Sequence, residues 1–284
     1  MSEENKKDLG KSKLGLSDKG LENSKGTLQK DSDESKVSSL FEVKEGERAG
    51  LRRGIYLLPN LITTGALFSG FYAIIAAMSG SLENAAIAIV IAGFLDALDG
   101  RIARMTNTQS EFGVQYDSLS DMVAFGVAPA VLMFSWVLSD LGKIGWMVAF
   151  LYMACAALRL ARFNTKPDSS VFFGLASPMA AGVIATTVWV WIEYLKIPAE
   201  VHYAVPLAFL TGILALLMVS NVRYYSPKQL SMKEGVPFAY MLGIISLFAL
   251  VFINPPVVLL IIGICYTFSG PIQALVRKKP AQVD

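Results

Sequence analysis

DALDGRIARMTNTQSEFGVQYDSLSD, residues 96–121, contains four aspartates in a chain whose other long hydrophobic stretches have the composition of membrane helices. Residues three or four apart on a helix share a face. Asp96 therefore neighbours Asp99 on one predicted helix, and Asp117 neighbours Asp121 on the next. The link between the two helices, MTNTQSEF, is short and polar. We expect adjacent antiparallel helices that present four carboxylates to one another near one membrane surface.

The composition of the chain indicates a membrane protein. Its 284 residues are 54% hydrophobic, and the mean hydropathy is +0.49. A membrane-spanning helix needs roughly 20 mostly apolar residues. The candidate segments are 56–79, 82–104, 114–138, 143–163, 176–195, 202–220, 235–253 and 256–275. We therefore expect an all-α fold, a polytopic membrane helix bundle of about eight transmembrane helices.

The distribution of basic residues provides an independent test of that count. Fifteen Lys and Arg residues follow residue 50. With eight spans and both termini in the cytoplasm, only Lys143 and Lys196 fall on the outer side. Cytoplasmic loops of membrane proteins carry such an excess of Lys and Arg. Six or seven spans would scatter the basic residues over both faces, so the sequence predicts eight spans with both termini cytoplasmic.

The first 50 residues differ from the rest of the chain. They hold ten Lys and Arg, eleven Asp and Glu and few large apolar residues. Such a segment cannot bury enough apolar surface to fold alone. We predict a disordered cytoplasmic tail over residues 1–50 and a membrane domain over 51–284. A bacterial-type cytoplasmic (inner) membrane is the expected location, and no nucleic-acid partner is expected.

The aspartate cluster predicts a metal site. A charge at the centre of a membrane span costs ~2.5–3.5 kcal/mol on insertion scales, and such residues usually mark function. One alternative is a set of Asp–Arg pairs at a helix end, but Arg101 and Arg104 cannot neutralise four carboxylates. Mg²⁺ or Mn²⁺ prefers oxygen ligands of this kind. A metal held beside an arginine suits a phosphate or pyrophosphate substrate, so phosphoryl-group transfer at the cytoplasmic surface is predicted.

The spacing of these residues resembles the signature of the CDP-alcohol phosphatidyltransferases. Eight fixed residues over 26 positions match, in the pattern Asp96-x2-Asp99-Gly100-x2-Ala103-Arg104-x8-Gly113-x3-Asp117-x3-Asp121. Members of that family transfer a phosphatidyl or similar group from a CDP-linked donor to an alcohol and release CMP. The resemblance implies catalytic roles for Asp117 and Asp121, with Asp121 as general base. It implies metal binding by Asp96, Asp99, Asp117 and Asp121, and a nucleotide and phosphate site of Asp96, Asp99, Gly100, Ala103, Arg104 and Gly113.

Residues outside the signature must select the alcohol. Three phrases lie on the predicted cytoplasmic side: AALRLARFN (156–164), VFFGLASPMAAG (171–182) and SNVRYYSPK (220–228). With YLLPNLIT (56–63) they resemble the phosphatidylserine synthase branch of the family. The resemblance implies CDP-diacylglycerol and L-serine as substrates, within a membrane of lipids. Arginine can hold the carboxylate of serine with two hydrogen bonds, so the predicted acceptor-binding residues are Arg159, Arg162 and Arg223.

Other interpretations stay open from the sequence alone. The acceptor of the same family could be glycerol 3-phosphate or inositol. An ion-coupled transporter also carries acidic residues in the membrane, and a scaffold could hold a salt-bridged helix pair. A phospholipase D-type mechanism needs two histidines, and His202 is the single one in the chain. Direct attack by the acceptor hydroxyl is therefore expected. The resemblance further implies a homodimer, and one departure from many relatives is Ala176, where proline is expected.

Overall fold

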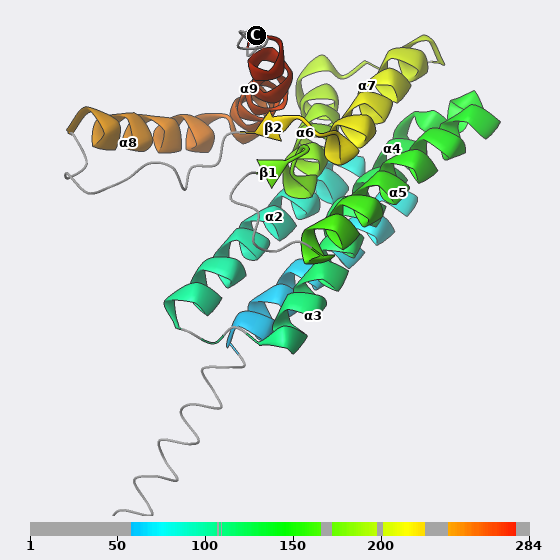
Figure 1. Cartoon of the computed structure of the whole chain (residues 1–284). Coiled ribbons are helices and arrows are strands. Elements are labelled where there is room, and N and C mark those ends of the chain that lie inside the picture. The colour runs from blue at the N-terminus through cyan, green and yellow to red at the C-terminus, as the bar shows by residue number, and fades with distance from the viewer. Residues whose placement is uncertain are drawn as a thin grey trace, which may run out of the picture. The chain divides into compact units, whose positions relative to one another are not determined.

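The computed structural model describes residues 58–106, 108, 110–165, 172–197, 201–224 and 238–276. The predicted tail over residues 1–50 lies outside these described residues. Each of the eight hydrophobic segments expected from the sequence contains a helix (Figure 1). The helices are Leu58–Met78, α2 (Leu82–Met105), α3 (Glu111–Asp121), α4 (Ala128–Trp136), α5 (Lys143–Thr165), α6 (Ser177–Val190), α7 (Val201–Val219), α8 (Phe238–Ile253) and α9 (Pro255–Val276). The π-helical turn η1 (Met122–Val127) joins α3 to α4, η2 (Leu138–Leu141) precedes α5, and η3 (Trp191–Leu195) extends α6.

Six of these helical segments are long and apolar enough to cross a membrane. They are Leu58–Met78, Glu111–Trp136, Lys143–Thr165, Ser177–Leu195, Val201–Val219 and Pro255–Ala274. The expected all-α polytopic membrane fold is thereby confirmed. The helix α2 is also long, with 24 residues, but it carries the charges of the aspartate motif. The helix α8 has 16 residues and is shorter than the roughly 20 that a span requires.

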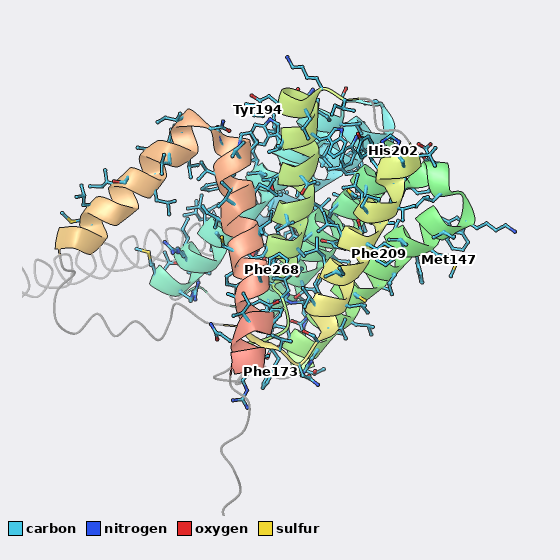
Figure 2. The ribbon with its side chains drawn as sticks, turned by 90° about the horizontal axis from the view of Figure 1, so that it is seen from above. Met147, Phe173, Tyr194, His202, Phe209 and Phe268 are labelled. Carbon is cyan, nitrogen blue, oxygen red and sulfur yellow. The ribbon has the colours of Figure 1, made fainter. Side chains whose placement is uncertain are left out.

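The helix α6 lies at the centre of the bundle. It packs against α2, α4, α7, α9 and η1, and α5 packs against α7. Alanine is frequent in the buried core, and small residues let membrane helices approach closely. A Cβ added to Gly70 would lie 2.7 Å from the Cα of Ala124, so helix Leu58–Met78 touches η1 backbone to backbone. Large side chains such as those of Phe209 and Phe268 instead lie exposed on the perimeter, where lipid would surround them (Figure 2).

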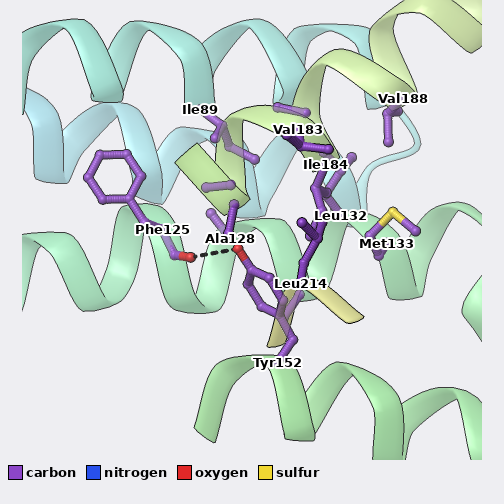
Figure 3. Close-up of a cluster of buried hydrophobic side chains, with 14 of the residues drawn as sticks. Ile89, Phe125, Ala128, Leu132, Met133, Tyr152, Val183, Ile184, Val188 and Leu214 are labelled. Atoms are coloured by element: carbon purple, nitrogen blue, oxygen red, sulfur yellow. Dashed lines mark hydrogen bonds between the residues drawn. The ribbon is translucent and has the colours of Figure 1, made fainter. Parts of the chain in front are cut away.

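A proline explains one contact deep in the core. Pro129 has no N–H, so the carbonyl of Phe125 loses the partner that a regular α-helix would provide four residues later. The hydroxyl of Tyr152, which is fully buried, donates to that carbonyl at 3.3 Å (Figure 3). The π-helical turn η1 lies at the same place, directly after Asp121. Such turns often occur at functional sites.

Among the described residues, the structure contains two short strands that the sequence did not predict. The strands β1 (Phe172–Phe173) and β2 (Arg223–Tyr224) pair antiparallel, with Phe172 opposite Tyr224 and Phe173 opposite Arg223. The ladder connects the segment before α6 to the segment after α7, and β2 contacts α9 (Figure 1). Two-residue strands give no periodic sequence signal, which is why an all-helical structure was expected throughout.

Candidate active site

The structure brings the four aspartates together as the spacing predicts. One carboxylate oxygen each from Asp96, Asp99 and Asp117 lies within 4.8 Å of the other two. Asp121 lies beside this group, with its carboxyl group close to that of Asp96. Asp121 also interacts electrostatically with Asp117 and Asp99. The cluster therefore consists of three converging carboxylates from α2 and α3 and a fourth at their side.

The first helix supports this cluster through a residue that sequence reasoning missed. The hydroxyl of Thr63 lies 2.7 Å from Oδ2 of Asp99, and both residues are buried. The hydroxyl of Ser120, next to Asp121, donates to the carbonyl of Thr63 at 3.2 Å. A carboxylate held at one oxygen has its orientation fixed, while its other oxygen stays available. The sequence contains only a weak signal for Thr63, because the same span has further polar residues, Asn60, Thr64 and Ser69.

The described residues contain no ion pair that neutralises the cluster. Arg101 and Arg104 are exposed, and the Nε of Arg104 donates to the carbonyl of Gly100 at 2.8 Å. The electrostatic neighbours of Asp117 are the carboxylates of Asp96 and Asp99. The alternative of Asp–Arg pairs at a helix end therefore has no support in the described part of the chain.

The donor set fits a divalent cation. Oδ1 of Asp117 is buried and makes no hydrogen bond. A buried carboxylate oxygen without a partner is costly, and a hard cation with oxygen ligands removes that cost. Asp96, Asp99 and Asp117 are the residues that meet closely enough to share one ion. Mutual repulsion of like charges in the bare cluster points to the same conclusion.

The small residues of the motif lie around the cluster. Gly100 and Ala103 are half-buried on the last turns of α2. Gly113 lies in the first turn of α3, where its N–H is capped by the hydroxyl of Ser110 at 3.0 Å. A Cβ on Gly113 would stand 3.1 Å from that hydroxyl oxygen and 3.4 Å from Oδ1 of Asn60. A glycine at this position therefore lets α3 approach the first helix; the nucleotide-binding role of these residues stays a prediction.

Arg159 reaches the acidic cluster from α5. Its Nη1 donates to the hydroxyl of Ser177, at the start of α6, at 2.8 Å. Its guanidinium interacts electrostatically with Asp121, and its buried Nε has no hydrogen-bond partner. A largely buried guanidinium with a single neutral partner is unfavourable unless an anion completes its coordination. Arg159 therefore places an incompletely hydrogen-bonded guanidinium near Asp121, and its role in binding the acceptor stays a prediction.

Arg162 and Arg223 form a second group. Arg162 lies one helical turn after Arg159 on α5, and Arg223 lies in β2. Both guanidinium carbons lie 5.7 Å from the centre of the Phe173 ring. Nη2 of Arg162 donates to Oδ1 of Asn221 at 2.8 Å. The three predicted acceptor arginines thus separate into Arg159 at the cluster and an exposed pair at the β1–β2 ladder. Sequence reasoning did not identify Phe173 or Asn221, because neither is close to Arg162 in the chain.

Two further residues singled out in the sequence, His202 and Ala176, lie in the described part of the chain. His202 lies at the start of α7, whereas the ladder follows the other end of this helix, which is about 27 Å long at 1.5 Å per residue (Figure 2). The histidine and the ladder therefore lie at opposite ends of α7. Ala176, which precedes α6, has a φ of −62° and a ψ of 134°. A proline ring imposes nearly the same φ, so the alanine preserves the turn.

Comparison with known proteins agrees with this geometry. The family profile described as CDP-alcohol phosphatidyltransferase matches residues 56–252. A CDP-diacylglycerol–serine O-phosphatidyltransferase of Helicobacter pylori is 36% identical over 224 residues, which are 78% of this chain and 92% of that protein. One from Bacillus subtilis is 33% identical over 168 residues, 59% of this chain and 89% of that protein. An archaetidylserine synthase of Methanothermobacter thermautotrophicus is 35% identical over 170 residues, 59% of this chain and 69% of that protein. By its profile match, its relatives and its aspartate cluster, the chain belongs to the CDP-alcohol phosphatidyltransferase family.

Proposed function

We propose that this chain is an enzyme that transfers the phosphatidyl group of CDP-diacylglycerol to the hydroxyl of L-serine, with phosphatidylserine and CMP as products. The observation that carries the proposal is the group of three converging carboxylates with a fourth at its side, which form no ion pair with any basic residue in the described part of the chain. The names of the bacterial relatives give the donor and the acceptor. Oxygen ligands in this number suit Mg²⁺ or Mn²⁺.

The four aspartates have two different roles, metal binding and proton transfer. Asp96, Asp99 and Asp117 hold the ion, which when bound neutralises charge on the phosphoryl oxygens of the donor. Asp121 lies outside the three converging oxygens and accepts the proton of the serine hydroxyl as general base. The serine oxygen forms a bond to the phosphorus that carries diacylglycerol, and the bond from that phosphorus to the CMP oxygen breaks. Gly100, Ala103, Arg104 and Gly113 line the nucleotide and phosphate site by the family resemblance.

The arginines orient the acceptor. Arg159 lies beside Asp121 with an unpartnered Nε, so a carboxylate bound there holds serine close to its base. Arg162 and Arg223 extend the positive region outward. Glycerol 3-phosphate would use the same arginines, and inositol carries no charge for them. The planar fork of Arg159 suits a carboxylate and a phosphate alike, so the names of the relatives are what favour serine.

We also propose the membrane arrangement that the sequence predicts. In this proposal all eight segments form spans. The helix α2 has the length of a span and places Asp96 and Asp99 near α3 and the first helix. The helix α8 has 16 residues, so its assignment as a span rests on the distribution of basic residues. Both termini and the aspartate cluster then face the cytoplasm of a bacterial-type inner membrane, with the basic residues at the ends of α2 and α5 on that side. A homodimer in lipid completes the proposal.

One assay tests the reaction and the acceptor together. Purified protein is supplied with CDP-diacylglycerol and one acceptor at a time (serine, glycerol 3-phosphate or inositol), with Mg²⁺, Mn²⁺ or a chelator. CMP and the lipid product are measured by mass spectrometry. We expect phosphatidylserine to form only in the reactions that contain both serine and a metal ion. Another lipid product would retain the aspartate chemistry and reject the acceptor assignment, and an absence of CMP in every reaction would reject the function. Direct displacement further requires that labelled CMP does not exchange into CDP-diacylglycerol when serine is absent.

A further inference from the structure

The β1–β2 ladder is held rigidly from two sides. The N–H of Gly174 donates to the carbonyl of Val222 at 2.9 Å. Gly174 has a φ of +81°, and a Cβ there would collide with the carbonyl of Met218, so this position requires glycine. On the other side, the ring of Tyr224 stacks on Tyr266 with centroids 5.4 Å apart.

The hydroxyl of Tyr224 fixes the ladder to α9. It donates to the carbonyl of Thr267 at 3.1 Å. Burial raises the pKa of Tyr224 to about 12, so the hydroxyl keeps its proton and remains a donor. A Cβ on Gly270 would stand 2.5 Å from the tyrosine ring. The ladder is therefore a fixed platform rather than a loose crossing of two loops.

The platform gathers two positive charges around a neutral ring. Phe173 is paired directly with Arg223 across the ladder, and directly paired residues project to the same face. Arg162 reaches the same ring from the end of α5, and each guanidinium carbon lies 5.7 Å from the ring centre. Two guanidinium groups repel each other at short range. No described carboxylate forms an ion pair with either of them.

An aromatic ring and an acidic side chain would hold these arginines with different consequences. An acidic partner would accept hydrogen bonds from the guanidinium and neutralise its charge. The face of a phenylalanine attracts the cation and leaves its N–H groups free. Beside the ring, Arg223 lines a cavity of about 500 Å³ together with Asn221, Val222, Gln273 and Ala274. This volume lies within the range of small-molecule sites, roughly 300–1,000 Å³.

We propose that Phe173 is a positioning residue that holds Arg162 next to Arg223, which lines this cavity, so that both charges attract the carboxylate of the acceptor towards Arg159. The proposal rests on the function proposed above and adds the feature that keeps the outer arginines in place. Phe173 itself touches no reacting atom. It acts by fixing the directions of two guanidinium groups that would otherwise separate, because their charges repel.

The test compares variants of the full-length purified protein in phosphatidylserine formation. Phe173→Leu removes the ring face and keeps an apolar side chain, Phe173→Tyr keeps the ring, and Phe209→Leu changes an exposed phenylalanine on the lipid-facing side of α7. For each, the KM of serine, the KM of CDP-diacylglycerol and kcat are measured. Inhibition constants are measured for 3-hydroxypropionate, which is serine without the ammonium group, and for ethanolamine, which is serine without the carboxylate.

We expect Phe173→Leu to raise the KM of serine and the inhibition constant of 3-hydroxypropionate by about 3- to 10-fold, the size of one or two weak cation–ring contacts. The inhibition constant of ethanolamine, kcat and the KM of CDP-diacylglycerol should stay at wild-type values. Phe173→Tyr should restore the serine KM, and Phe209→Leu should leave it unchanged. Phe173→Met carries the same expectation and replaces the leucine variant if that protein does not fold.

Two results would overturn the positioning role. One is an unchanged serine KM in Phe173→Leu while Arg162→Gln or Arg223→Gln raises it, which would leave the proposed function intact. The other is an equal change in both substrate KM values together with a lower kcat, which indicates a purely structural role. Failure of the function itself is recognised separately, because wild-type protein would then form no phosphatidylserine at all.

Discussion

The acidic cluster and the arginine pair are opposite in charge and alike in how the protein supports them. Asp99 is held by the hydroxyl of Thr63, and Arg162 is held by an amide oxygen of Asn221 and the ring of Phe173. In both places the supporting group is neutral. Neither set of charges is cancelled by an ion pair among the described residues.

This similarity explains why an expensive arrangement of charges persists in a membrane protein. Pairing the aspartates with the arginines would lower the cost of burying both, but it would leave nothing for a metal or an anionic substrate. Neutral hydrogen-bonding and aromatic partners fix the orientation of the charged side chains and leave their charge available for a metal or a substrate. The difference between the two regions is burial: the aspartates lie between helices, whereas Arg162 and Arg223 are exposed. Changes in the acidic cluster should therefore have the larger effects.

The largest effect is expected for Asp121→Asn. Asparagine has a similar shape and cannot accept the serine proton, so kcat should fall by about 10²–10⁴, the range for loss of a general base. The measurement is CMP release by purified protein, with elution volume and melting temperature as checks of folding. Asp140→Asn, an exposed aspartate in η2, is the matched control and should be fully active. Substantial turnover by a folded Asp121→Asn protein would remove Asp121 as the base.

The second largest effect is expected for Thr63→Val, which removes the hydrogen-bond partner of Asp99. Thr63→Val replaces the hydroxyl by a methyl group of similar volume, so Asp99 loses the donor that orients it. Loss of such an outer partner typically lowers metal affinity by about 10- to 100-fold, and Mn²⁺ titration should show this. Thr63→Ser should bind as wild type does. The control is Thr64→Val, because Thr64 bonds to Asn60 and Tyr116 instead. Equal affinities for the two valine variants would show that the Thr63 contact does not orient the cluster.

A smaller and more selective effect is expected for Arg159→Lys. Lysine keeps the charge and lacks the planar fork, so the KM of serine should rise about tenfold, the cost of roughly one charge-assisted hydrogen bond. The KM of CDP-diacylglycerol should change less, and Arg162→Lys should show the same selectivity with a smaller change. Arg101→Lys, an exposed arginine, serves as control. A parallel rise for both substrates would count against an acceptor role.

The smallest effect concerns the turn before α6. Ala176 already has the φ of a proline, and its N–H makes no hydrogen bond in the structure. Ala176→Pro should raise the free energy of unfolding by about 0.4–1 kcal/mol by restricting the unfolded chain. Thermal unfolding in detergent measures the change. Ala181→Pro, inside α6, should instead lower the melting temperature. A destabilised Ala176→Pro protein would show that the turn differs from that of proline-containing relatives.

The two regions also differ in how far the sequence predicts them. The aspartates are three and four residues apart on helices joined by a short link, so local geometry alone brings them together. Thr63 lies 36 residues from Asp99, and Asn221 lies 59 residues from Arg162. Such contacts depend on how distant helices pack, which periodicity does not determine. For the same reason, the two-residue ladder and the contact of Arg223 with Phe173 could not be predicted from the sequence.

The helix segments were predictable because length and hydropathy are local properties. All eight appear as helices, although six meet the criteria of length and apolarity for a span. The charges of the active-site motif are what set α2 apart. A functional site inside a membrane segment thus obscures the signal by which the segment is recognised.

The central claim is that the aspartate cluster is left uncompensated in order to bind a divalent cation. Electron paramagnetic resonance of Mn²⁺ with purified wild-type and Asp117→Asn protein, with and without CDP-diacylglycerol, tests it most directly. We predict a bound Mn²⁺ signal in wild-type protein that Mg²⁺ displaces and that Asp117→Asn loses, while Asp140→Asn retains it. No bound Mn²⁺ in wild-type protein with the donor present, or equal binding by wild-type and Asp117→Asn protein, would contradict the account.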